Sequence, residues 1–319
     1  MTWVRPIDTE EAGVPGDSDG ETEELYVGTL AGTIWDVETS PSEIEFSRPV
    51  DGKVIATHLI SDARDSGSVA DLVDVHTGAT TRLGEFEGII GDAIIDPGTN
   101  EWYWTIWPGD GGISGVWRQS LDGGPAERIT GPDPNTAGYL VASLDGRWIA
   151  VWGGHPNDLV FDTTDSTFTL VPTAHIGDIV GFMGDRLIAY VRGRSDGGLH
   201  FPLYAIDVHD GSMTTIVEGN GMFAVIFGSD DGPQLLHDGY DTNGSRQFYA
   251  QSRSDQGRDR LIYSADSASD PEEDGPFLAR YGLDESGYAP LVLHSPYQVP
   301  GLLVSLSDGT VYSVPPIGG

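Results

Sequence analysis

The stretch Tyr139–Pro172, YLVASLDGRWIAVWGGHPNDLVFDTTDSTFTLVP, decides how the rest of the chain is interpreted. Each of its four apolar runs is about five residues long and rich in Val, Ile, Leu or aromatic residues; they are residues 139–143, 147–152, 159–163 and 168–172. Gly, Asp, Asn and Ser separate the runs, beginning with the turn at Asp145 and Gly146. Apolar runs punctuated by such residues are typical of short antiparallel strands joined by turns. The stretch therefore predicts a meander of four strands.

The same pattern recurs along the whole chain. Its first turn appears six times, with glycines at Gly52, Gly98, Gly146, Gly184, Gly232 and Gly287, and the mean interval between them is 47 residues. An apolar strand follows each turn, such as WYWTIW or LIAYVR. A period in the forties with four strands per unit is typical of the blades of a β-propeller. We therefore predict an all-β protein, a β-propeller of four-stranded antiparallel blades.

The predicted propeller is a single domain over residues 1–319. Six repeat units of about 47 residues cover residues 43–315, and residues 1–46 supply further strands. We expect these N-terminal strands to close the ring by pairing with the C-terminal strands, because such pairing protects strand edges. On that interpretation there are seven blades, which we favour over six.

Two phrases within the repeats, SLDGRWIAVW and VWRQSLDGGPAERIT, resemble the repeats of TolB-type propellers, also called WD40-like or PD40 repeats. The two ends, LYVGTLAGTIWDVETS and LLVSLSDGTVYSVPP, look more like the repeat of quinoprotein-type propellers. The resemblance covers most of the chain and implies a propeller fold. It implies little about a ligand, because this architecture hosts many unrelated functions.

The chain is strongly acidic. It has 50 Asp and Glu against 16 Lys and Arg, a net charge of −34, and a single lysine, Lys53. At low ionic strength such a surface repels itself and opposes compaction, whereas in molar salt the screening length shrinks to about 3 Å. We therefore favour a protein adapted to high salt, from a salt-accumulating organism. An acidic extracellular bacterial protein is the alternative.

Composition also excludes several partners and locations. No basic stripe is present for phosphates, so we expect no nucleic-acid partner. No apolar run approaches the length of a membrane span, so we expect no membrane insertion. The N-terminus lacks the apolar core of a secretory signal. We favour a cytoplasmic protein, and a mature extracellular form or an assembly component remains open.

Histidines occur at closely matching positions after the second predicted strand of four units: His58, His155, His237 and His294. In propellers the loops that follow this strand share one rim, so these side chains could form a ring around the axis. Neutral imidazoles bind transition metals well. The pattern offers a candidate divalent-metal site, although histidines that cap strand ends or hydrogen-bond loops would give the same spacing.

Four further residues are candidates for binding a ligand at this rim: Trp107, Asp158, Arg192 and Asp238. The two aspartates could add oxygen ligands to a metal. Arg192 could hold a carboxylate or pair with a neighbouring blade, and Trp107, at a strand end, could be an exposed stacking platform. The arrangement is similar in principle to oligogalacturonate lyases, propellers of the TolB-like type that hold a metal with histidines at the channel mouth.

Two segments carry expectations about burial. In EWYWTIW, residues 101–107, alternate residues place Trp102 and Trp104 on one face and Tyr103 on the other. Apolar character on both faces predicts a strand sandwiched between neighbouring blades. The segment 238–260, DGYDTNGSRQFYAQSRSDQGRDR, has a strand pattern with little apolar content, so we expect a hairpin that projects into solvent.

The function favoured by these observations is non-catalytic. The sequence contains no phosphate-binding loop or dinucleotide-binding fingerprint. The resemblance to TolB-type propellers implies a scaffold for protein binding or assembly, whose partner is another protein or an assembly subunit. Two alternatives are a metal-dependent lyase or sugar-binding propeller that uses the histidine rim, and a structural component of a virion or cell-surface assembly.

Overall fold

The computed structural model describes the strands and turns of most repeats. The described residues are 2–7, 22–28, 34–38, 44–47, 50–60, 67–74, 77–107, 115–129, 138–152, 158–171, 176–191, 202–217, 224–227, 232–240, 242, 245–252, 259–264, 277–278, 288–292, 301–305 and 310–313. The chain divides into two compact units. The first comprises residues 1–29 and 33–172, and the second residues 30–32 and 173–319.

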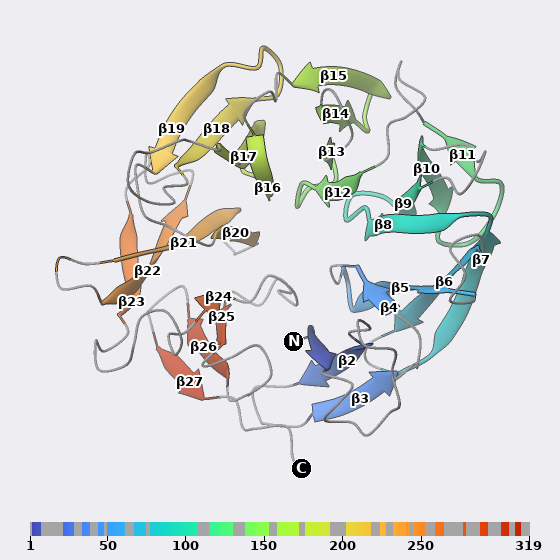
Figure 1. The fold of residues 1–319 in the computed structure, drawn as a ribbon, viewed down its shortest axis with the longest axis horizontal. Coiled ribbons are helices and arrows are strands. Elements are labelled where there is room, and N and C mark those ends of the chain that lie inside the picture. Colours follow the sequence, from blue (N-terminus) through green and yellow to red (C-terminus); the bar gives the residue numbers. More distant parts are fainter. Residues whose placement is uncertain are drawn as a thin grey trace. The chain divides into compact units, whose positions relative to one another are not determined.

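The first unit contains four antiparallel sheets (Figure 1). Sheet 1 is three-stranded: β1 (Thr2–Ile7), β2 (Thr22–Gly28) and β3 (Ile34–Glu38). Sheet 2 consists of β4 (Ile44–Phe46), β5 (Lys53–Leu59), β6 (Ser68–Asp74) and β7 (Thr80–Phe86). Sheet 3 consists of β8 (Ile89–Ile95), β9 (Glu101–Trp107), β10 (Gly115–Ser120) and β11 (Glu127–Arg128). Sheet 4 consists of β12 (Tyr139–Ala142), β13 (Trp148–Trp152), β14 (Asp158–Asp162) and β15 (Thr167–Val171).

The second unit contains three four-stranded antiparallel sheets. Sheet 5 consists of β16 (Ile176–Phe182), β17 (Arg186–Val191), β18 (Leu203–Asp207) and β19 (Met213–Val217). Sheet 6 consists of β20 (Ala224–Phe227), β21 (Gln234–Tyr240), β22 (Arg246–Ser252) and β23 (Arg260–Ser264). Sheet 7 consists of β24 (Phe277–Leu278), β25 (Tyr288–Val292), β26 (Gly301–Ser305) and β27 (Val311–Ser313).

The prediction of an all-β protein made of four-stranded meanders is confirmed. In every sheet, strands adjacent in sequence are adjacent in space, and the four strands expected within residues 139–172 are β12 to β15. Their pairing is antiparallel throughout. The number of blades, the single domain and the closure of the ring by residues 1–46 remain predictions. In the part of the chain that is described, no helix has the length and apolarity to cross a membrane.

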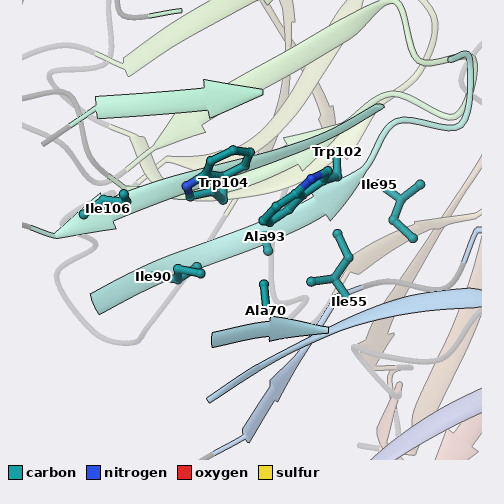
Figure 2. Packing of buried hydrophobic residues seen from close by; sticks show 8 residues of the cluster. All are labelled: Ile55, Ala70, Ile90, Ala93, Ile95, Trp102, Trp104 and Ile106. Atoms are coloured by element: carbon teal, nitrogen blue, oxygen red, sulfur yellow. The ribbon is translucent and has the colours of Figure 1, made fainter. Parts of the chain in front are cut away.

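Strand β9 packs against both of its neighbouring sheets. On one face, Trp102 and Trp104 stack with ring centroids 4.0 Å apart and planes 20° apart. Figure 2 shows these rings in a buried cluster with residues of sheet 2, among them Ile55 and Ala70. On the other face, the fully buried Tyr103 packs into a cluster with residues of sheet 4 such as Phe161. The prediction of a sandwiched strand is confirmed.

Side-chain hydrogen bonds connect sheet 2 to β8, the first strand of sheet 3, and sheet 3 to β12, the first strand of sheet 4. The Ser68 hydroxyl donates to the Gly88 carbonyl and accepts from the Ile90 amide, each at 3.0 Å. A carboxylate oxygen of Asp92 accepts from the Leu140 amide at 2.6 Å. The Thr105 hydroxyl donates to the Gly138 carbonyl at 2.8 Å. Backbone groups at the start of β8 and β12 therefore find hydrogen-bond partners in side chains of the preceding sheet.

Two of the repeated turns meet within the first unit. Asp96 is fully buried; its carboxylate accepts from the Gly98 amide at 2.7 Å and from the Thr99 hydroxyl at 2.9 Å. Burial raises the pKa of the Asp96 carboxyl, with the hydrogen bonds opposing that shift. Gly146, at φ +71°, lies so close that a Cβ there would stand 1.9 Å from an Asp96 oxygen and 2.4 Å from the Gly98 nitrogen. The repeated glycine is required here by contact as well as by conformation.

Replacing Gly146 by Ala should therefore destabilise the protein far more than the same change at Gly78. Gly78 has a nearly identical φ of +69° but open space around its Cβ position. Gly78→Ala should cost about 1–2 kcal/mol for the left-handed backbone alone. Gly146→Ala should cost about 1–3 kcal/mol more, because backbone atoms must move to accept the methyl group. Denaturant unfolding of both variants in molar KCl measures the difference, and equal losses would contradict the contact.

Candidate functional site

The register of the sheets defines an equivalent position in each repeat. In every four-stranded sheet, one residue of the second strand lies opposite the first residue of the first strand, and we call this position the rim register. Its six occupants are His58, Trp107, Trp152, Val191, His237 and Val292. Two of the four candidate histidines and the candidate tryptophan thus occupy equivalent positions.

The other candidates lie close to this register in sequence. His155, Arg192 and His294 lie outside the described residues, and follow the rim-register residues Trp152, Val191 and Val292 by three, one and two positions. Asp158 is the first residue of β14, and for Asp158 and Trp107 only the backbone is described. His58 belongs to the first unit and His237 to the second. Convergence of the histidines on one metal therefore remains a prediction.

His237 is buried and held by two oxygen atoms. It is 3% exposed, with Nε2 3.0 Å from a carboxylate oxygen of Asp259 and Nδ1 3.3 Å from the Asp238 carbonyl. The imidazole stacks on Tyr249, with ring centroids 5.3 Å apart. Gln251 donates to the same Asp259 oxygen at 3.2 Å. A carboxylate on one ring nitrogen is the contact that orients a ligand imidazole, but here the second nitrogen faces a carbonyl.

Asp238 is also buried and is held by Arg246 on β22. Nε and Nη2 of Arg246 both donate to Oδ2 of Asp238, the first at 2.8 Å. Both residues are less than 5% exposed. The pairing is diagonal, because Arg246 lies opposite Tyr240, two residues beyond Asp238. Across the described residues, no three His, Cys, Asp or Glu side chains come together to hold a metal ion.

These contacts correct the expectation that the hairpin of residues 238–260 projects into solvent. Both strands of this hairpin, β21 and β22, are largely buried. Sheet 6 buries six polar or charged side chains: Gln234, His237, Asp238, Arg246, Gln251 and Ser252. The sequence reasoning missed Arg246, Asp259 and Tyr249 because it equated polar composition with exposure. The usable signal was the pair of opposite charges, Asp238 and Arg246, which antiparallel pairing brings together.

An exposed aromatic residue lies opposite one of the rim-register positions. Tyr139 is 53% exposed and is the one aromatic among the large apolar side chains that are exposed in the described chain. It lies opposite Trp152, with ring centroids 5.2 Å apart and planes tilted by 34°. Tyrosine and tryptophan combine a large apolar surface with a polar atom, which suits them to binding at a surface.

Comparison with known proteins supports the fold. No family model matches the chain, and no curated protein matches it in sequence. The β-propeller domain of the Trilobed protease from Pyrococcus furiosus is 15% identical, with a TM-score of 0.59 over 88% of this chain and 85% of that one. An oligogalacturonate lyase from Vibrio parahaemolyticus is 13% identical, with a TM-score of 0.59 over 98% of this chain and 85% of that one. The chain is thus an all-β protein with the β-propeller fold.

Larger enzymes contain a similar part. A prolyl endopeptidase is 16% identical, with a TM-score of 0.62 over 92% of this chain, which spans 46% of that protein.

TolB from Acinetobacter baumannii also matches, at 15% identity and a TM-score of 0.48 over 98% of this chain and 84% of that one. The protease propeller domain and the oligogalacturonate lyase confirm the propeller part of the resemblance, and the assignment to PD40 repeats remains a prediction. At these identities the similarity establishes the fold alone.

Removing one member of the Asp238–Arg246 pair should cost far more than removing both. Arg246→Met leaves the Asp238 carboxylate buried without its cation, which should lower the free energy of unfolding by about 3–5 kcal/mol. The double variant Asp238→Leu/Arg246→Met buries no unpaired charge and should recover most of that loss. Denaturant unfolding in molar KCl measures both values. If the double variant loses at least as much as Arg246→Met, the pair does not act as a unit.

Proposed function

We propose that this protein is a non-catalytic β-propeller scaffold that binds or assembles with another protein in high salt. The observation that carries the proposal is the contrast at the rim register. Of the polar groups at or beside this register, His237 and its neighbour Asp238 are buried and held within sheet 6, and His58 is half-buried. The more exposed group is Tyr139, which lies opposite the half-buried Trp152 and packs against its ring.

Such a pair is suited to anchoring a protein partner. Tyrosine and tryptophan are enriched among the few residues that carry most of the energy of protein interfaces. An aromatic anchor also keeps its strength in molar salt, where the screening length falls to about 3 Å and surface charges contribute little. The acidic surface, with a net charge of −34, then keeps the scaffold soluble, while the aromatic pair provides the contact.

The test is partner capture by an immobilised protein from an extract of its own source, in molar KCl. The native chain and a Met213→Ala control, which alters an exposed apolar residue in another sheet, should retain the same stoichiometric partner. The Tyr139→Ala variant should retain at least tenfold less of this partner. Its melting temperature should be unchanged, because Tyr139 is exposed. Equal retention by all three proteins, or retention by none, would contradict the proposal.

A second candidate is a metal-dependent lyase or sugar-binding propeller that uses the histidine rim. It is favoured by the shared register of His58 and His237 and by the Asp259 contact, which is of the kind that orients a ligand histidine. On this interpretation His155 and His294 add ligands, Asp158 or Asp238 adds an oxygen, and Arg192 and Trp107 contact a sugar acid.

Elemental analysis separates the two candidates. Protein purified without a metal-affinity column should carry a stoichiometric transition metal if the rim is a metal site. A His155→Ala/His237→Ala double variant should lose the metal, whereas His209→Ala, at an exposed turn between β18 and β19, should keep it. Metal-free native protein would rule out the lyase and leave the scaffold.

A further inference from the structure

The last strand of each sheet has an edge that could pair with another chain, and six of these seven strands carry a feature that discourages pairing. Charged side chains, bulges and short length are the usual protections. The strands β3, β7 and β23 contain charged residues and pair through a register shift. Strand β19 pairs through a register shift, β11 is two residues long, and β27 is three.

Strand β15 has none of these features. It is five residues long, reads TFTLV, and contains no charge, proline or glycine. It pairs with β14 in continuous register from Thr167 to Val171. In a chain with 50 acidic and 16 basic residues, a regular uncharged edge of this length stands apart from the other last strands that the structure describes.

The edge is also held in place by its own hairpin. The Asp165 carboxylate accepts from the backbone amide of Thr167 at 3.0 Å and from its hydroxyl. The Asp162 carboxylate accepts from the Thr164 amide at 2.9 Å, and the Phe168 ring packs on Phe161 with centroids 4.8 Å apart. A strand that is already ordered loses little conformational entropy when a second strand pairs with it.

We propose that β15 is a homodimer interface, at which it pairs antiparallel with β15 of a second copy of this chain. The strand is self-complementary about Thr169. With Thr169 opposite its own copy, Phe168 lies opposite Leu170 and Thr167 opposite Val171, and Thr–Thr pairs are favourable across strands. The two four-stranded sheets then join into one of eight strands, within the usual size of an open sheet.

Charge identifies a second copy as the occupant. Antiparallel pairing about a two-fold axis uses the same patch on both partners, so a charge at position 169 would face its own copy and a charge at a flanking position would lie near its copy. The strand has none. The remaining obstacle is the repulsion between two bodies of net charge −34, which molar salt screens within about 3 Å. The dimer should therefore strengthen as salt rises.

This inference goes beyond the proposed function, because it depends on neither the Tyr139–Trp152 pair nor a foreign partner. A monomeric chain can still bind another protein, and a dimer can form in a chain that binds none. The two proposals therefore fail independently.

The test is sedimentation equilibrium of the native chain over a concentration series, at several KCl concentrations at which the fold is intact. We expect a monomer–dimer equilibrium with a Kd that falls as KCl rises. Hydrogen exchange should slow, on dimerisation, at the alternate β15 amides that do not bond to β14. Thr169→Lys, a charge at the centre of β15, should raise the Kd at least tenfold. Its matched control is Thr215→Lys, at the centre of β19.

Several outcomes of these measurements would overturn the proposed dimer interface. A chain that stays monomeric at every soluble concentration overturns the proposal, even if β15 binds another protein. A dimer whose β15 amides exchange as they do in the monomer also overturns it. If Thr169→Lys fails to fold, hydrogen exchange on the native chain decides alone. A Thr215→Lys control that dissociates as readily as Thr169→Lys would place the interface elsewhere.

Discussion

The packing of β9 against sheets on both sides is the interaction on which the first unit depends. Burying an aromatic ring removes about 150–250 Å² from water, worth about 4–6 kcal/mol at ~25 cal/mol per Å². The indole N–H groups of Trp102 and Trp104 lack an acceptor among the described residues, a cost of about 1–3 kcal/mol each. Burial outweighs that cost, so the rings remain inside. Because both faces of β9 are apolar, sheet 3 requires sheets 2 and 4.

Sheet 6 buries polar and charged side chains as well as apolar ones. Its buried face residues include His237, Asp238 and Arg246, which gain stability only through specific hydrogen bonds. A buried ion pair contributes little net stability against an apolar replacement, but a shifted strand register would leave both charges unpaired. The apolar sheets of the first unit are thus stabilised mainly by the apolar surface area that they bury. In sheet 6 the buried polar contacts mainly determine which strand register is adopted.

The sequence predicted the strands and their order well, because β-rich runs between Asp- and Gly-containing turns are a local signal. It predicted the two-sided burial of β9, since alternate residues of EWYWTIW are apolar on each face. It failed at sheet 6, where the partner of Asp238 lies across a hairpin and only the register identifies it as Arg246. The histidine positions show the same limit: the spacing predicted that His58 and His237 follow the second strand, whereas both lie within it, on β5 and β21, at one register.

The net charge and the residues of the strand edges both oppose unwanted strand pairing between copies of the chain. At low salt, long-range repulsion between bodies of charge −34 would keep every edge apart, whatever its sequence. In molar salt that repulsion is screened within about 3 Å, and each edge must be protected by its own residues. The charges and bulges on β3, β7 and β23 then have a purpose that the global charge cannot serve. In a chain predicted to function in high salt, an edge without such features is therefore better explained by a partner than by the absence of selection.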